Sequence, residues 1–212
     1  MYKDVFAALS DRDIKDLENY AELAGSVGGD YLEIGSLQGG STLAILEKMP
    51  ESSILFCLDI WGRVENYETF CFNIKRYNKW NNIVPIIGDF RNTYKYISNK
   101  RKLSFVFVDN DHTFFTTALP IYYFWNNLLP GGYMLFHDYK HPNYPGVEEF
   151  ISLYALEVWG ETISDRPGVF IMKKMKDIDE NFLLDQKEKL NKRFGKDACY
   201  LDVAIKRLNN NE

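Results

Sequence analysis

Hydrophobic and polar residues follow two patterns that alternate along the chain. Between residues 10 and 24, apolar side chains recur every three or four positions, which predicts an amphipathic helix. The run LSFVFVD at 103–109 is instead apolar almost throughout, as expected of a parallel strand covered on both faces. Strand-like and helical segments alternate at least five times. We therefore predict an α/β fold with a doubly wound, mostly parallel sheet and helices on both faces.

The limits of the predicted elements follow from caps, glycines and prolines. Ser10 and Asp13 form a capping-box pattern at the start of the first helix. Pro85 places the third strand near a sheet edge or makes it irregular, and Pro120 is expected to interrupt its helix. The segment SDRPG predicts a hairpin turn before an antiparallel last strand. Predicted helices span 10–24, 41–49, 66–77, 93–99, 115–128, 146–155 and 177–194, and predicted strands span 31–35, 53–60, 82–89, 103–109, 129–138, 156–163 and 168–174.

Length and composition indicate one globular domain. The chain has 212 residues, of which 46% are hydrophobic and 26% are charged, as is ordinary for a soluble protein. No internal repeat or low-complexity linker divides it. We expect a single domain over 1–212, with a core at about 28–174, an N-terminal helical cover over 1–27 and C-terminal helices over 177–209.

Charge and hydropathy exclude several classes of protein. The net charge of −5 argues against general nucleic-acid binding, which draws on a surplus of Lys and Arg. No apolar run approaches the roughly 18 residues that a membrane span needs, and the N-terminus lacks the pattern of a signal peptide. The three cysteines form no CxxC pair and indicate neither a disulfide framework nor a zinc site. We expect a cytoplasmic protein without nucleic-acid or membrane partners.

The glycine-containing turn in YLEIGSLQGGST is the first candidate site. Gly35, which Ser36 follows directly, and Gly39 let the backbone turn tightly and let a ligand approach it. Ser41 and Thr42 add hydroxyls and free N–H groups at the start of the next helix. The spacing lacks the G-x-G-x-x-G of a dinucleotide site, and Glu33 would repel a pyrophosphate but attract an ammonium group. This pattern favours S-adenosylmethionine, which carries an ammonium and a sulfonium but no phosphate. The alternative is a plain strand–turn–helix with a capping glutamate.

Two further strand ends carry acids beside apolar side chains. Asp59 in LDIWG could accept hydrogen bonds from both ribose hydroxyls, with Ile60 and Trp61 flanking an adenine ring, although Trp61 could instead pack in the core. Asp89 in IIGDF could bind the adenine amino group, with Phe90 as a packing face, although an N-cap is the alternative role. The predicted cofactor-binding residues are Glu33, Gly35, Ser36, Gly39, Ser41, Asp59, Ile60, Trp61, Gly88, Asp89, Phe90 and Asp109.

A second polar cluster follows two neighbouring strands. Asp109, Asp111 and His112 follow one strand, and His137 and Asp138 end the next, so all five should meet at one edge of the sheet. A hydroxyl acceptor needs a base or a cation that lowers its pKa. Asp109 and Asp138 suit Mg²⁺, whereas His137 suits Mn²⁺, Fe²⁺ or Zn²⁺ better. Asp111 or His112 is then the candidate catalytic base, and a reaction without a cation is the alternative.

The ordered motifs YLEIGSLQGGST, LDIWG, IIGDF, FVFVDNDH and LLPGGYMLFHDY closely resemble class I S-adenosylmethionine-dependent methyltransferases. The resemblance covers roughly residues 28–174 and is strongest to the small branch related to macrocin O-methyltransferases and cephalosporin-hydroxylase-type proteins. It implies a seven-stranded sheet with an antiparallel final strand, Asp109 and Asp138 as metal ligands, and Asp111 as base. The chain departs from that pattern with His137–Asp138 in place of paired acids, and with Asn110 where a glycine is common.

Together these patterns predict an S-adenosylmethionine-dependent methyltransferase. The acceptor would be a small molecule, such as the hydroxyl of a sugar or secondary metabolite, with Mg²⁺ or Mn²⁺ as a candidate second cofactor. A nicotinamide-dependent oxidoreductase and a non-catalytic nucleoside-binding module on the same fold are the alternatives. The aromatic run IYYFW indicates core packing or a face for homo-oligomer formation.

Overall fold

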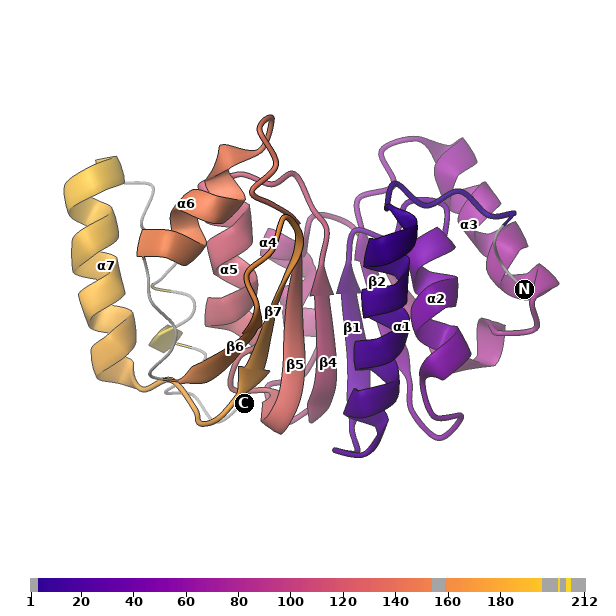
Figure 1. The fold of residues 1–212 in the computed structure, drawn as a ribbon, viewed down its shortest axis with the longest axis horizontal. Helices are drawn as coiled ribbons and strands as arrows, with labels where there is room; N and C mark the ends of the chain where they lie inside the picture. The colour runs from indigo at the N-terminus through magenta and orange to yellow at the C-terminus, as the bar shows by residue number, and fades with distance from the viewer. Residues whose placement is uncertain (1–3, 154–158, 196–201, 203–204, 207–212) are drawn as a thin grey trace.

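The structure is a seven-stranded sheet with helices on both faces (Figure 1). It is a computed structural model that describes residues 4–153, 159–195, 202 and 205–206. The strands lie in the order β3-β2-β1-β4-β5-β7-β6. All described neighbours pair in parallel except β7, which is antiparallel to β5 and β6, so the predicted sheet with an antiparallel final strand is confirmed. The strands are β1 (Asp30–Ile34), β2 (Leu55–Asp59), β3 (Ile83–Ile87), β4 (Leu103–Val108), β5 (Leu128–Tyr139), β6 (Gly160–Ser164) and β7 (Gly168–Lys174).

Two hydrophobic cores separate the sheet from its helical layers. In β1, Leu32 and Ile34 belong to one core, whereas Tyr31 belongs to the other, because alternate strand residues point to opposite faces. Helices α1, α2 and α3 pack in the core that contains Tyr31, and α5, α6 and α7 pack in the other. The helices are α1 (Asp11–Gly25), α2 (Gly40–Lys48), α3 (Val64–Arg76), α4 (Phe90–Thr93), α5 (Phe114–Phe124), α6 (Pro145–Leu153) and α7 (Glu180–Phe194), with short 3₁₀ turns at Trp80–Asn82 and Tyr94–Tyr96.

The order of the strands indicates where in the sheet a ligand site is expected. The chain runs outward from β1 to β3 and then returns to β4, on the other side of β1. The connections after β1 and β4 therefore leave in opposite directions from adjacent strands. Ligands of open α/β sheets bind beyond the carboxyl ends of the strands at such a reversal. The predicted site residues lie at the ends of β1, β2, β3, β4 and β5 or in the segments that follow them.

Several local predictions are confirmed and two are wrong. The capping box of Ser10 and Asp13 is present, and β3, with Pro85, is an edge strand. The helix predicted at 93–99 starts earlier, because Asp89 caps α4. Pro120 does not interrupt α5, which continues through it to Phe124.

Some predicted elements differ in position from the observed ones, and others fall partly outside the described residues. The sequence Pro130–Gly131–Gly132 is typical of a tight turn from a helix into a strand. In the structure these residues lie inside β5, where the pairing with β4 shifts register. The ends of the predicted elements at 154–155 and 156–158, and most of the C-terminal segment beyond 195, fall outside the described residues. No helix in the described part of the chain is both long enough and apolar enough to cross a membrane.

Candidate active site

Gly35 brings the end of β1 into contact with the end of β4. Its φ of +98° favours glycine, and a Cβ at this position would lie 1.8 Å from the backbone oxygen of Asp109. Gly39, with φ of +91°, then turns the chain into α2. The two glycines therefore make the tight turn that the sequence predicted. Gly35 also permits the close approach of the ends of β1 and β4, because it has no side chain.

A cavity of about 340 Å³ opens beside this turn, at the carboxyl ends of β1, β2, β3 and β4. Its wall joins acids with apolar side chains, as a nucleoside site requires. The predicted residues on this wall are Gly35, Asp59, Ile60, Asp89, Phe90, Asp109 and Asp111. The structure thus brings together residues from four separate loops.

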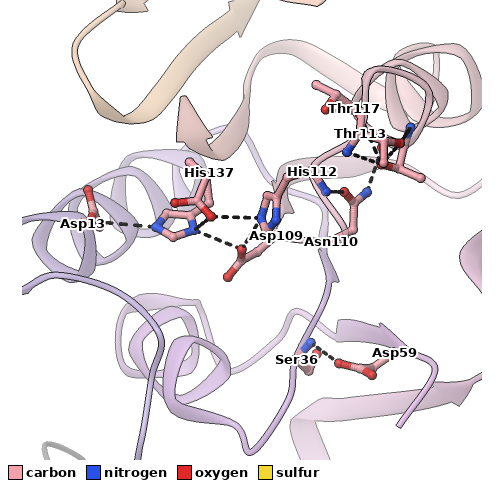
Figure 2. Close-up of polar contacts among 11 residues, drawn as sticks. Asp13, Ser36, Asp59, Asp109, Asn110, His112, Thr113, Thr117 and His137 are labelled. Carbon is pink, nitrogen blue, oxygen red and sulfur yellow. Dashed lines mark hydrogen bonds and ion pairs between the residues drawn. The ribbon is translucent and has the colours of Figure 1, made fainter. Parts of the chain in front are cut away.

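Asp59 is the acceptor that organises the turn. One carboxylate oxygen accepts the backbone N–H of Ser36 at 2.8 Å (Figure 2) and that of Leu37 at 2.8 Å. The other oxygen accepts the N–H of Trp61 at 2.7 Å. A carboxylate has about four acceptor positions, so three are occupied and one is left for a ligand hydroxyl, whereas the sequence predicted acceptance from two. Gly88 joins this network because its N–H donates to the backbone oxygen of Asp59 at 2.9 Å.

Glu33 lies beneath the turn and not on the cavity wall. The side chain is fully buried, and one oxygen accepts hydrogen bonds from the hydroxyls of Ser36 at 2.6 Å and Thr42 at 2.5 Å. Its other oxygen has no hydrogen-bond partner among the described residues. Burial raises the pKa of Glu33 to about 7, although the hydroxyls of Ser36, Ser41 and Thr42 act in the opposite direction. In this structure Glu33 supports the loop and does not face the cavity.

Ile60, and not Trp61, presents an apolar surface to the cavity. Ile60 is 63% exposed and lies on the cavity wall. Trp61 is 6% exposed, packs against Tyr67 and Phe70, and donates its indole N–H to the backbone oxygen of Leu37 at 2.7 Å. The core-packing role that the sequence left open for Trp61 is thus the one observed.

Asp89 is the N-cap of α4, which is the alternative that the sequence left open. Its carboxylate accepts the N–H of Arg91 at 2.9 Å and pairs with the guanidinium of the same residue. The hydrogen bonds from Arg91 hold the pKa of Asp89 below its usual value. Asp89 and Arg91 also line the cavity beside the buried Phe90, so the cap does not remove the carboxylate from the site.

Four side chains gather at the ends of β4 and β5. The ligand atoms of Asp109, His112, His137 and Asp138 all lie within 4.8 Å of one another. Asp109 Oδ1 lies 3.0 Å from both His112 Nε2 and His137 Nδ1 (Figure 2), and Asp138 Oδ2 lies 3.3 Å and 3.5 Å from the same nitrogens. The sequence predicted three of these residues as ligands and His112 as a base. The structure places His112 in the same cluster as the three candidate ligands, and the turn after β4 brings it there.

Opposite charges dominate the electrostatics of this cluster. Burial disfavours the charged imidazolium, but the hydrogen bond and charge of Asp109, with Asp138 and Asp13, outweigh it and raise the pKa of His137. Burial likewise disfavours the Asp109 carboxylate, but His112 and His137 outweigh it and lower its pKa. Two residues of this cluster also have a strained backbone, because both His112 and Asp138 have φ of +57°.

The donor set of the cluster fits a divalent transition-metal ion. Two imidazole nitrogens and two carboxylate oxygens suit Mn²⁺, Fe²⁺ or Zn²⁺, whereas Mg²⁺ prefers oxygen alone. Asp109 belongs to this cluster and also lines the cavity, so the two parts of the site meet at one residue. Asp111 lies on the cavity wall, is exposed, and is not a member of the cluster.

Two contributors to the site have no local signature in the sequence. Asp13 of α1 faces His137, with Oδ2 3.9 Å from Nε2 (Figure 2). Asn110 donates from its side-chain amide to the backbone oxygen of Thr116 at 2.7 Å. The capping box explains the type of residue at position 13, but only the packing of α1 against the sheet brings it to the histidine.

Known proteins match this chain at two levels. A family model described as "Methyltransferase domain" matches residues 32–139, just over half of the chain. No curated protein matches the sequence. Similar solved structures include the O-methyltransferase TomG from Streptomyces achromogenes in complex with SAM, which is 17% identical with a TM-score of 0.63 and coverage of 79% of this chain and 82% of that one.

Two other solved structures are similar to the same extent. An O-methyltransferase from Bacillus cereus in complex with SAH is 19% identical, with a TM-score of 0.62 and coverage of 81% and 85% of the two chains. CalS11, a TDP-rhamnose 3'-O-methyltransferase, is 14% identical, with a TM-score of 0.62 and coverage of 76% and 78%. At these identities the likeness shows a shared fold.

Proposed function

Because the chain belongs to the methyltransferase-domain family, we propose that it transfers the methyl group of S-adenosylmethionine to a hydroxyl oxygen of a small molecule. One observation carries this proposal: Asp109 lies on the cavity wall and also belongs to the cluster that it forms with His112, His137 and Asp138. A methyl donor in the cavity and an acceptor at the cluster would meet beside this residue. Holding the two in line supplies much of the rate of such a transfer.

The cavity has groups that suit the nucleoside part of the methyl donor. Asp59 keeps one acceptor position for a ribose hydroxyl, and Ile60 and Phe90 provide apolar surfaces for the adenine ring. The similar fold of TomG with SAM, and of the Bacillus cereus enzyme with SAH, supports this choice of ligand. The family match and the missing dinucleotide fingerprint both count against a nicotinamide cofactor.

A divalent cation at the cluster is the second part of the proposal. Asp109, His112, His137 and Asp138 would hold it, and the donor set favours Mn²⁺ over Mg²⁺. A cation there lowers the pKa of a bound hydroxyl. Asp111, exposed on the adjacent wall, is then the base that takes the proton, since both histidines are engaged with carboxylates. The likeness to the sugar O-methyltransferase CalS11 supports a sugar-like acceptor.

Calorimetric titration of the metal-stripped protein tests both parts. We expect S-adenosylhomocysteine to bind with a micromolar dissociation constant and NADH not to bind. We expect Mn²⁺ to bind, and His137→Gln to weaken that binding at least tenfold. The matched control is His141→Gln, because His141 lies on the next loop but outside the cluster.

The outcomes separate the two parts of the proposal. Binding of NADH without S-adenosylhomocysteine would overturn the methyl-donor assignment. Equal Mn²⁺ affinities of the wild type and His137→Gln would overturn the cation site and leave Asp111 as the base of a cation-free transfer. Binding of S-adenosylhomocysteine without methyl transfer to any hydroxylated acceptor, even with Mn²⁺ present, would favour a non-catalytic nucleoside-binding role.

A further inference from the structure

The imidazole of His137 lies between carboxylates on both sides. Its Nδ1 is 3.0 Å from Oδ1 of Asp109, inside the cluster, and its Nε2 is 3.9 Å from Oδ2 of Asp13, outside it (Figure 2). Asp13 comes from α1, on the N-terminal side of the part of the chain that the methyltransferase-domain model matches. The second carboxylate is therefore a contribution of the helical cover and not of the matched domain.

Asp13 is held in place and is not a mobile surface acid. The residue is 6% exposed, and its Oδ2 accepts hydrogen bonds from the backbone N–H of Ser10 at 3.2 Å and from its hydroxyl at 2.5 Å. On the other side lies Gly168 of β7, where an added Cβ would be 2.6 Å from Asp13 Oδ1. The capping box fixes the carboxylate, and the glycine leaves room for it.

The position of the imidazole proton decides which nitrogen can bind a cation. A neutral imidazole carries one proton, and only the other nitrogen has a free lone pair. Asp109 attracts the proton to Nδ1, which would block that nitrogen, whereas Asp13 attracts it to Nε2. Metal-bound histidines commonly donate their remaining N–H to a carboxylate, which fixes the tautomer and the ring orientation.

We propose that Asp13 is a positioning residue that keeps the proton of His137 on Nε2 and so directs Nδ1 to the cation. The inference rests on the cation site of the proposed function. A contraction of about 1 Å would turn the observed 3.9 Å separation into a hydrogen bond. Helix α1 would then contribute a functional side chain to the site, in addition to packing against the sheet.

Titration of the metal-stripped full chain with Mn²⁺ tests this role. Asp13→Asn keeps an oxygen that can accept from Ser10, so the helix cap is retained while the charge is lost. We expect the Mn²⁺ dissociation constant of this variant to rise about 10- to 100-fold. Asp16→Asn is the matched control, because it removes the same charge from the same helix, where Asp16 pairs with Arg166 outside the cluster. We expect its affinity to match the wild type.

Nitrogen NMR of the Zn²⁺-loaded wild type gives a readout that a purely structural role would not move. We expect His137 to bind through Nδ1 and to carry its proton on Nε2. Binding through Nε2 would overturn the inference, even if Asp13→Asn fails to fold. Equal Mn²⁺ affinities of the wild type and Asp13→Asn would overturn it while leaving the cation site in place. Absence of Mn²⁺ and Zn²⁺ binding by the wild type would overturn the cation site and this inference together.

Discussion

Asn110 replaces the hydrogen bond that Pro120 cannot make. A helical residue donates its N–H to the carbonyl four positions earlier, which for Pro120 is that of Thr116, but proline has no N–H. Asn110 donates its side-chain amide to this carbonyl at 2.7 Å, and its own side-chain oxygen accepts the N–H of His112 at 3.2 Å. One side chain therefore permits a proline inside a buried helix and ties that helix to the site loop.

Loss of the Asn110 side chain should cost stability because it leaves a buried carbonyl without a donor. We expect Asn110→Ala to lower the free energy of unfolding by about 1–3 kcal/mol, measured with urea. In a Pro120→Ala background the backbone N–H returns, so the same change should cost about 1 kcal/mol less. A double-mutant cycle measures this coupling. Equal costs in both backgrounds would show that Asn110 does not compensate for the proline.

The pKa of Glu33 makes stability depend on pH. Burial raises it to about 7 from 4.5, so the folded protein binds this proton more tightly than the unfolded chain does. The resulting stabilisation is fully present below about pH 4.5 and is lost as the pH rises through 7, by about 3 kcal/mol at about 1.4 kcal/mol per pKa unit.

Glu33→Gln removes this titration. We expect the variant to gain stability relative to the wild type between pH 5 and pH 8, as measured by urea unfolding at both values. The amide N–H₂ would face the position where Oε1 has no partner among the described residues, and this lowers the stability of the variant equally at both pH values. The change in the stability difference between pH 5 and pH 8 therefore reports the titration of Glu33 alone. A stability difference that is the same at both pH values would show that Glu33 titrates normally in the folded protein.

Gly35 should not tolerate a side chain. We expect Gly35→Ala to destabilise the protein by about 3 kcal/mol or more, since the new Cβ would overlap the Asp109 carbonyl and the φ is unfavourable for alanine. Gly28→Ala is the control, because Gly28 also has a positive φ but nothing lies within 4 Å of its Cβ position. It should cost only about 1 kcal/mol. Similar losses for the two variants would mean that the contact with Asp109 is unimportant.

Asp59 should matter for the cofactor more than for the fold. We expect Asp59→Asn to raise the dissociation constant of S-adenosylhomocysteine about 10- to 100-fold in calorimetry, because an amide nitrogen would then face backbone N–H donors and the turn would loosen. Asp30→Asn, which breaks the ion pair with Arg101 at the opposite edge of the sheet, should leave this affinity unchanged. Unchanged binding by Asp59→Asn would remove the carboxylate from the cofactor site.

The alternation of strands and helices could be predicted because it depends on local spacing. Uninterrupted apolar runs and helical spacing each span one element, and they predicted the sheet and its helical layers. The gathering of Asp109, His137 and Asp138 was predicted for a related reason. Parallel strands end at the same edge of a sheet, so residues at their ends become neighbours whatever their separation in sequence.

Tertiary structure alone decided which way individual side chains face and which distant residues they meet. Trp61 and Ile60 are adjacent in sequence, but a positive φ at Trp61 and the ring packing of α3 bury one and leave the other on the cavity wall. Asp13 reaches His137 only because α1 packs across the sheet beside β7. Such contacts depend on the angle and register at which elements pack. The residue pattern within one element specifies neither of them, so these contacts could not be predicted from the sequence.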